Sequence, residues 1–279
     1  MTGQAELAQK FRARHQPGNP LFMPNVWDAL SARITAEAGF EALATTSGGV
    51  AWALGHADEE HTPWDEEIAA LRRITRAARG LPVTADIEGG FGATPDDVGD
   101  HIVQVARAGV VGVNLEDSTG GALRPVDEAA ARIAGARAGA ARAGVPVVIN
   151  ARCDVFMLGG DTPDALLDAA LARGRAYLRA GADCIFPFGL LDPARIARFC
   201  RDLGAPVNVS ARPGLPGVAE LARLGVARIT TGTATTLVAA AATRHLMQAL
   251  RAGAPFDVLS AAMTYPDAQA LFRTEGHQP

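Results

Sequence analysis

The chain has 279 residues, 48% of them hydrophobic, with a net charge of −4 and a pI near 5.9. This composition supports the core of a globular fold, and the acidic balance argues against the basic surface typical of nucleic-acid-binding proteins. No apolar run reaches the roughly 18 residues of a membrane span, and the first residues lack a basic-then-apolar signal pattern, so we expect a cytoplasmic protein that binds neither membrane nor nucleic acid.

The cysteine and lysine content disfavours two further classes of protein, disulfide-rich proteins and Schiff-base aldolases. The three cysteines, Cys153, Cys184 and Cys200, include no C-x-x-C pair, and an odd number in a cytosolic chain argues against a disulfide framework. Lys10 is the only lysine, and it precedes the first predicted strand. Because a Schiff-base aldolase needs a lysine within its barrel, covalent imine chemistry is disfavoured.

One pattern recurs along the chain: an Ala-, Arg- and Leu-rich helix, a glycine, and then an apolar strand. Glycine fits the left-handed position that ends a helix. Asp28, Thr94 and the Asp161-Thr162 pair offer the N-cap side chains that start helices. The glycines that end helices are 39, 80, 109, 144, 181, 204 and 225, and the predicted strands are residues 21–24, 41–45, 82–86, 110–116, 145–152, 182–187, 205–210 and 226–231.

Eight alternating units with continuously apolar strands are typical of a parallel sheet buried on both faces. We therefore predict an α/β fold, a (β/α)8 TIM barrel, with residues 1–279 as a single domain. Residues 1–20 form a polar lead-in helix or arm. Residues 234–250 form a strongly apolar last helix, which packs on its own barrel or is exchanged with a partner subunit. The second arrangement predicts a homo-oligomer, a dimer or tetramer.

Two acidic clusters each follow a short apolar run, one strand–helix unit apart. The first contains Asp86 and Glu88, and the second contains Glu116 and Asp117. The carboxyl ends of neighbouring parallel strands meet at one edge, so we expect three or four carboxylates to converge. Crowded carboxylates repel unless a cation or protons neutralise them, and oxygen ligands suit Mg²⁺, with Mn²⁺ as an alternative. Arg152 ends the next strand, which indicates a metal-dependent site for an anionic substrate.

Several segments together resemble the isocitrate lyase/phosphoenolpyruvate mutase superfamily over roughly residues 22–250. The resemblance implies a TIM barrel and Mg²⁺-dependent chemistry through the enolate of pyruvate or a related 2-oxo acid. The matching segments are Ser31-Ala32, Thr46-Ser-Gly-Gly, Leu54-Gly55-x-x-Asp58, Asp86-x-Glu88-Gly-Gly-Phe-Gly92, Glu116-Asp117 and Asn150-Ala-Arg152-x-Asp154.

The resemblance also implies a role for each matching acid. Asp86, Glu88 and Glu116 would hold Mg²⁺, partly through water molecules, and Asp58 would lie near the metal. Arg152 would face the negative charge that develops on the substrate. On this basis Arg152, Asp58 and Glu116 are the expected catalytic residues.

The substrate would be held by a second set of residues that the resemblance identifies. The backbone N–H groups of Ser47 and Gly48 would bind a carboxylate or enolate oxygen, as an oxyanion hole does. Asn208, at the end of the seventh strand, would help to bind the distal carboxylate. The expected substrate-binding residues are Thr46, Ser47, Gly48, Asp86, Arg152 and Asn208.

Two positions depart from the family pattern. Glu88 stands where many relatives have aspartate, which adds a methylene to a metal ligand. The segment from Ser118 to Pro125 is short and contains no Cys, Lys or His. Isocitrate and methylisocitrate lyases carry a Lys-Lys/Arg-Cys-Gly-His segment there, whose cysteine protonates the enolate, and phosphoenolpyruvate mutases carry a longer loop with an asparagine. These departures disfavour isocitrate lyase activity and leave phosphoenolpyruvate mutase activity unsupported.

Other candidate residues have a structural interpretation beside the functional one. Cys153 is favoured as a buried small residue over a thiol that replaces the missing acid, because alternation places it opposite Arg152. His56 is favoured as a solvated loop residue over a proton donor. Residues 230–236, rich in threonine, are favoured as a helix start over a phosphate site. The arginines within 72–79 and 132–142 are interpreted as solvated helix faces.

The sequence therefore predicts a Mg²⁺-dependent carbon–carbon lyase acting on a small 2-oxo or 2-hydroxy di- or tricarboxylic acid. Cleavage of a methylisocitrate- or dimethylmalate-like compound and decarboxylation of oxaloacetate fit the residues equally. A phosphonopyruvate hydrolase or phosphoenolpyruvate mutase-like enzyme is one alternative. A non-catalytic barrel that binds 2-oxo acids is the other, because the metal residues stand beside a missing loop acid.

Overall fold

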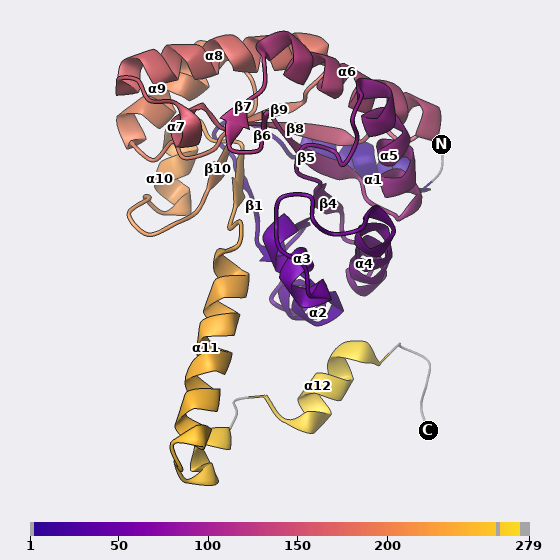
Figure 1. The fold of residues 1–279 in the computed structure, drawn as a ribbon, viewed down its shortest axis with the longest axis vertical. Coiled ribbons are helices and arrows are strands. Elements are labelled where there is room, and N and C mark those ends of the chain that lie inside the picture. Colours follow the sequence, from indigo (N-terminus) through magenta and orange to yellow (C-terminus); the bar gives the residue numbers. More distant parts are fainter. Residues whose placement is uncertain (1–2, 261–262, 274–279) are drawn as a thin grey trace.

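The computed structural model describes residues 3–260 and 263–273, and its strands close into a parallel barrel (Figure 1). Pro24, which has no backbone N–H, divides the first strand into two pieces that pair with different neighbours. The barrel strands are β1 (Leu21–Met23) with β2 (Asn25–Val26), β3 (Leu43–Thr45), β4 (Val83–Asp86), β5 (Gly112–Glu116), β8 (Val148–Cys153), β9 (Cys184–Pro187), β10 (Asn208–Ser210) and β11 (Arg228–Thr230).

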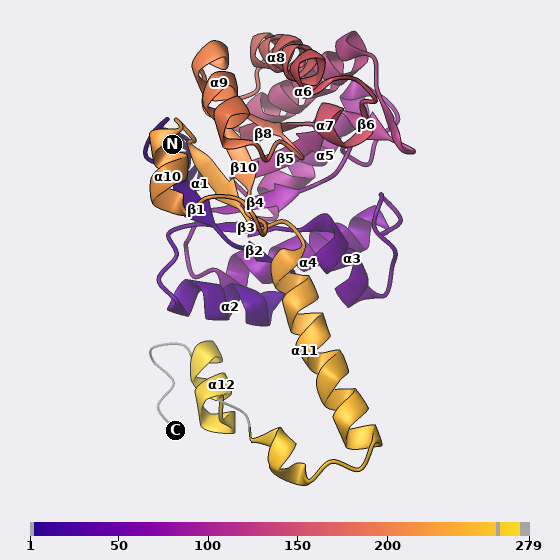
Figure 2. The ribbon, with the colours of Figure 1, turned by 90° about the vertical axis from the view of Figure 1, so that its left-hand side faces the viewer.

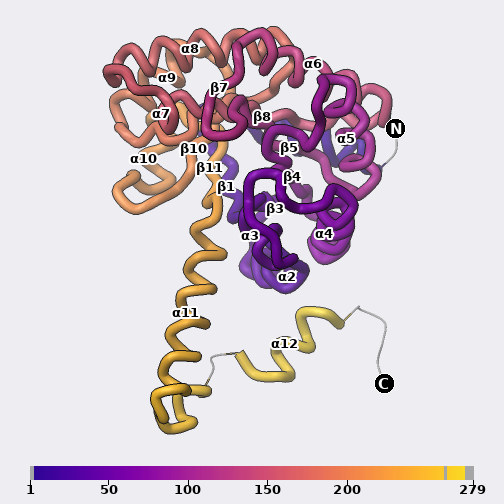
Figure 3. The backbone as a smooth tube through the Cα atoms, in the orientation of Figure 1, coloured from indigo at the N-terminus to yellow at the C-terminus, as the bar shows by residue number. Residues whose placement is uncertain are grey.

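The pairing of these strands forms a closed ring. Strands β2, β3, β4, β5, β8 and β9 are parallel neighbours in that order, and β11 lies between β10 and β1 (Figure 3). A parallel bridge from Ile185 to Val207 joins the two groups. The eight predicted strand positions and the (β/α)8 barrel are therefore confirmed, while the assignment of residues 1–279 to one domain stays a prediction.

Helices lie between the strands, and their ends are where the sequence predicts them. Asp28 and Thr94 form capping boxes, and Thr162 accepts a hydrogen bond from the N–H of Ala165. All seven glycines predicted to end helices have positive φ. The helices are α1 (Gly3–Ala13), α2 (Ala29–Glu37), α3 (Ser47–Leu54), α4 (Trp64–Ala77), α5 (Pro95–Arg107), α6 (Val126–Ala143), α7 (Val155–Leu158), α8 (Pro163–Ala180), α9 (Pro193–Leu203), α10 (Val218–Arg223), α11 (Ala234–Arg251), η1 (Phe256–Leu259) and α12 (Tyr265–Phe272).

Helix α1 covers the end of the barrel where the strands begin. The side-chain amide of Gln4 donates to the carbonyl oxygens of Ala106 and Val110, and Arg12 forms an ion pair with Asp183 at 3.1 Å. Phe11 is buried beneath the strands. The lead-in helix is thus part of the fold, and it leaves the opposite end of the barrel for the site.

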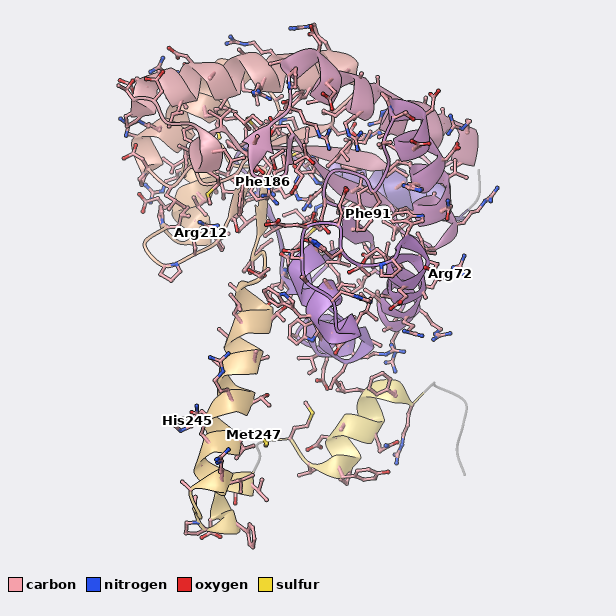
Figure 4. The ribbon with its side chains drawn as sticks, viewed as in Figure 1. Arg72, Phe91, Phe186, Arg212, His245 and Met247 are labelled. Carbon is pink, nitrogen blue, oxygen red and sulfur yellow. The ribbon has the colours of Figure 1, made fainter. Side chains whose placement is uncertain are left out.

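Helix α11 extends away from its own barrel instead of packing on it (Figures 1 and 2). Thr236 is its only buried residue, whereas Leu237 and Val238 are 51% and 71% exposed. Figure 4 labels His245 and Met247 on the projecting part. The chain then turns back, so that α12 packs against α2, where Arg79 donates to the carbonyl oxygen of Leu271 at 3.0 Å. Exchange of α11 between subunits stays a prediction.

Among the described residues, none of the helices has the length and apolar character that a membrane span requires. The three cysteines are buried and free, as the sequence predicts.

Candidate active site

The carboxyl ends of the strands line two cavities of about 260 and 380 Å³. Ser47, Asp58 and Arg152 belong to the walls of both. Glu88 and Glu116 line the smaller cavity, and Thr46 and Asp86 line the larger one. Seven of the residues predicted from the sequence are therefore brought together at one end of the barrel.

Arg152 is the centre of the charged cluster. Its guanidinium lies 2.6 Å from a carboxylate oxygen of Glu116 and 2.6 Å from one of Asp154, and it stacks over the ring of Phe188 at 4.1 Å. Burial opposes the charge, but Glu116, Asp154 and Asp86 outweigh burial and raise the pKa of the guanidinium. Arg152 is a fixed positive charge whose position is set before any ligand binds.

The negative charges of the predicted metal ligands are not balanced to the same extent by nearby positive charges. Burial, together with the nearby Asp58 and Asp86, raises the pKa of Glu88 to about 9. Burial also raises the pKa of Glu116 to about 8, although Arg152 lowers it in part. The pKa of Asp86 is raised by burial, against the effect of Arg152. These shifts are the behaviour expected of carboxylates crowded without a cation.

Two loops hold Glu88 in place. Its backbone has a φ of +50°, a left-handed conformation that is uncommon outside glycine and concentrated at functional sites. The carboxylate of Glu88 accepts a hydrogen bond from the N–H of Glu60 at 2.7 Å, and the carboxylate of Glu60 accepts one from the N–H of Phe91 at 2.7 Å. The loop after β4 is therefore tied to the loop that carries Asp58.

Arg132 supports the same loop from beneath, so the interpretation of every arginine within 132–142 as solvated is wrong. The side chain of Arg132 is 2% exposed. Its guanidinium donates to the carbonyl oxygens of Gly89 at 3.1 Å and Gly92 at 2.8 Å. A turn that follows a strand offers carbonyl groups without backbone partners, and Arg132 supplies the donors that they need.

Ser47 and Gly48 open helix α3, so their N–H groups have no acceptor within the helix. The carboxylate of Asp58 lies directly beside this helix start. A Cβ atom added at Gly48 would lie 2.8 Å from Oδ2 of Asp58. Only glycine lets the backbone and the carboxylate approach this closely, which explains the glycine at position 48.

Two predicted residues do not reach the site. Asp117, expected among the converging carboxylates, accepts hydrogen bonds from Tyr177 at 2.6 Å and Arg173 at 3.0 Å on the outer face of its strand. Asn208, expected to bind a distal carboxylate, is fully buried and donates to Oγ1 of Thr230 at 3.2 Å. Neither residue lines either of the two cavities, so Asp117 is not among the converging carboxylates, and the role expected of Asn208 stays a prediction.

The segment after β5 is a β-hairpin. Strands β6 (Ser118–Thr119) and β7 (Ala122–Leu123) are antiparallel and joined by Gly120 and Gly121, both with positive φ. Such two-residue turns require that conformation. The hairpin lines the smaller cavity and brings no Cys, Lys or His to it.

The structural interpretations of two further residues are supported. Cys153 is fully buried, and burial raises the pKa of its thiol. Nε2 of His56 lies 3.1 Å from a carboxylate oxygen of Glu66, and His56 lines neither cavity. Neither residue is placed to replace the missing loop acid.

Sequence reasoning missed Glu67, in the first turn of α4. It is 2% exposed, and burial and the nearby Asp86 and Asp58 raise its pKa to about 8. One signal was available: Glu67 precedes Ala70, Leu71 and Ile74 by three, four and seven positions, so it lies on the buried face of the helix.

The residues fit a hard cation that keeps part of its water shell. One carboxylate oxygen of Asp58 and one of Glu67 are buried and have no hydrogen-bond partner among the described residues. In the same part of the chain, no three acidic, histidine or cysteine side chains meet closely enough to hold an ion directly. Glu116 forms an ion pair with Arg152, which accounts in part for its separation from the other carboxylates. Mg²⁺ commonly retains several waters and takes only one or two protein carboxylates.

Comparison with known proteins places these features in a family. The phosphoenolpyruvate phosphomutase family model matches residues 11–251. A crystal structure of a candidate phosphonomutase from Burkholderia cenocepacia J2315 is 49% identical, with a TM-score of 0.84 over 87% of this chain and 99% of that one.

Two curated relatives match most of the chain. An uncharacterised protein of Mycobacterium tuberculosis (strain H37Rv) is 33% identical over 93% of this chain and 95% of its own length. An oxaloacetate decarboxylase of Ectopseudomonas mendocina is 31% identical over 93% and 90%. Solved structures of an oxaloacetate acetylhydrolase and of a phosphonopyruvate hydrolase, 26% and 24% identical to this chain, hold oxalate, the second together with Mg²⁺. The chain belongs to the phosphoenolpyruvate mutase/isocitrate lyase superfamily.

Proposed function

We propose that this protein is a Mg²⁺-dependent carbon–carbon lyase acting on a small 2-oxo or 2-hydroxy di- or tricarboxylic acid through a pyruvate-type enolate. The observation that carries the proposal is the convergence of Arg152 and Asp58 with Asp86, Glu88 and Glu116 on the two cavities. The proposal assigns Asp86, Glu88 and Glu116 to the ion, with Mn²⁺ as a substitute for Mg²⁺.

The protein residues have distinct tasks in this proposal. When bound, Mg²⁺ supplies positive charge that polarises the C2 oxygen of the substrate. Arg152, held by Glu116 and Asp154, adds a fixed positive charge where negative charge develops. The N–H groups of Ser47 and Gly48, next to Thr46, bind a substrate oxygen. One carboxylate oxygen of Asp58 accepts no hydrogen bond from the described residues, so it is available to bind a water.

One observation favours decarboxylation of oxaloacetate within this class: the curated decarboxylase matches the chain along nearly its whole length. The Ser118–Leu123 hairpin brings no cysteine, histidine or lysine to the cavity, so the proton that the enolate takes up at C3 would not come from such a side chain of this hairpin. Cleavage of a substituted malate stays within the proposed class.

The test is pyruvate release coupled to lactate dehydrogenase, with oxaloacetate, methylisocitrate, dimethylmalate and phosphonopyruvate as substrates. We expect turnover that requires Mg²⁺, is lost in Asp86→Ala and is retained in Glu220→Gln, a control at an exposed acid. Preferred turnover of phosphonopyruvate would reassign the enzyme to carbon–phosphorus chemistry. Mg²⁺-dependent binding of oxalate without turnover of any substrate would identify a non-catalytic binding protein.

A further inference from the structure

Arg212 follows β10 and lies in the wall of the larger cavity, as does Phe186; both are labelled in Figure 4. The guanidinium of Arg212 lies over the ring of Phe188, 5.1 Å from its centre. The guanidinium of Arg152 lies over the same ring at 4.1 Å. One aromatic side chain therefore supports two guanidinium groups at the same cavity, a favourable arrangement for both cations.

The two arginines differ in how their charges are balanced. Arg152 is paired with Glu116 and Asp154. For Arg212, no carboxylate within residues 3–260 and 263–273 forms an ion pair, and the residue is partly buried. A partly buried cation is costly without an anionic partner. An anion that enters this cavity gains the interaction that the protein itself does not provide.

The larger cavity also has two chemically different regions. Asp58 and Asp86 belong to the acidic region that we assign to the ion. Arg212 and the hydroxyl-bearing residues Ser210 and Thr231 line the same cavity without any acid from their own segments. A ligand could occupy both regions if its 2-oxo acid group lay at the acidic region and a second anionic group lay at Arg212.

Building on the proposed function, we infer that Arg212 binds the second carboxylate of the substrate. The planar guanidinium can donate two parallel hydrogen bonds to a carboxylate, a geometry that selects for this group. The protein therefore prefers 2-oxo or 2-hydroxy dicarboxylic acids to monocarboxylic ones. Arg212 takes the role that the sequence assigned to Asn208, which is buried below the cavity.

The test measures binding by calorimetry in the presence of Mg²⁺. Oxalate serves as a short probe of the metal region, and 3,3-difluorooxaloacetate serves as a longer probe with a distal carboxylate. The variants are Arg212→Met, Arg212→Lys and, as a matched control, Arg223→Met, whose arginine is 75% exposed on α10.

We expect Arg212→Met to weaken binding of 3,3-difluorooxaloacetate at least about tenfold, the effect of losing a hydrogen-bonded charge pair, and to leave oxalate binding within about twofold. Arg212→Lys should recover part of the loss, because it keeps the charge without the forked geometry. Arg223→Met should bind both probes like the wild type.

Three results would overturn the inference. Equal weakening of both probes in Arg212→Met would show that Arg212 maintains the shape of the whole site. Unchanged binding of the longer probe would show that its carboxylate lies elsewhere. If Arg212→Met weakened the binding of phosphonopyruvate more than that of 3,3-difluorooxaloacetate, the distal group that Arg212 binds would be a phosphonate. Failure of the wild type to bind oxalate with Mg²⁺ would instead contradict the proposed function.

Discussion

Arg228 donates a hydrogen bond from Nη2 to Oδ1 of Asn114 at 3.0 Å inside the barrel. Asn114 lies level with Asp86 on β4 and with Asn150 on β8, and it partly offsets the rise that burial causes in the pKa of the Asp86 carboxyl. The amide of Asn150 donates to the same Oδ1 at 2.8 Å. Two donors thus fix Oδ1 of Asn114, so its N–H groups are the part of the amide that remains for the neighbouring carboxylate of Asp86.

From this relationship we predict that Arg228→Met weakens Mg²⁺ or Mn²⁺ binding about tenfold, the usual effect of losing a residue that orients a metal ligand. The free energy of unfolding should not fall, because the change removes a buried guanidinium with two nitrogens that donate to none of the described residues. Calorimetric Mn²⁺ titration and denaturant unfolding would measure the two quantities.

A double variant tests whether Arg228 acts on the metal site by orienting Asn114 or by its general packing in the barrel. If Arg228 acts through Asn114, then Arg228→Met combined with Asn114→Ala should bind Mn²⁺ no more weakly than Asn114→Ala alone. Additive losses would show that Arg228 affects the site by another route.

Arg132→Met should destabilise the fold by about 3 kcal/mol, because it leaves the buried carbonyl group of Gly89 and the partly buried one of Gly92 without these donors. It should also weaken metal binding, since that loop carries Glu88. Arg142, on the same helix, forms an exposed ion pair with Asp100, so Arg142→Met should change stability by less than about 1 kcal/mol. Similar losses in both variants would contradict a specific role for Arg132.

Gly48→Ala should abolish the proposed turnover while the protein still folds. The new methyl group would lie 2.8 Å from Oδ2 of Asp58 and would displace that carboxylate from the helix start. Gly217→Ala is the control, because a Cβ there meets no atom within 4 Å. Activity with proposed substrates, together with circular dichroism, would detect the difference. Wild-type activity in Gly48→Ala would show that the close approach of Asp58 is not needed.

The pH dependence of stability should contain a contribution from His15. Burial, and then the charges of Arg228 and Arg12, lower its pKa to about 3, while Nδ1 lies 2.9 Å from the carbonyl oxygen of Phe11. Between pH 6.5 and about 3 the unfolded chain therefore binds a proton that the folded chain does not. The free energy of unfolding should fall as the pH falls, by up to about 1.4 kcal/mol per unit.

The variant His15→Phe isolates this contribution. It removes the titrating group and keeps an aromatic ring near Phe11, whose ring meets His15 edge-on at 4.8 Å. Denaturant unfolding of both proteins from pH 7 to 4 should give a shallower slope for the variant. Parallel pH profiles would show that His15 is protonated alike in the folded and unfolded states.

The barrel could be predicted from the sequence because its signals are local. The seven glycines predicted to end helices all have positive φ, and the apolar barrel strands are largely buried. The site carboxylates Asp86, Glu88 and Glu116 follow from the same reasoning, since strand ends determine which residues meet.

Whether the other residues reach the site depends on how deep they lie in the barrel and on which face of the strand they occupy. Assigning the strands determines neither. Asn208 and Ser210 share a face of β10, but Asn208 lies level with Arg228, one layer below the residue that reaches the cavity. Asp117 follows Glu116 by one position, so alternation directs it to the opposite face. Arg132 is buried because a loop from a distant strand covers its helix, a contact that helical periodicity does not encode.

The projecting helix α11 also has a consequence for local stability. Helices in proteins owe most of their stability to packing, and in this chain nearly all of α11 lacks it. In dilute solution its backbone amides should exchange with solvent deuterium far faster than those of the barrel strands, because opening the helix exposes little buried surface. If exchange slows as the protein concentration rises, the degree of slowing would measure how strongly a second molecule covers the helix.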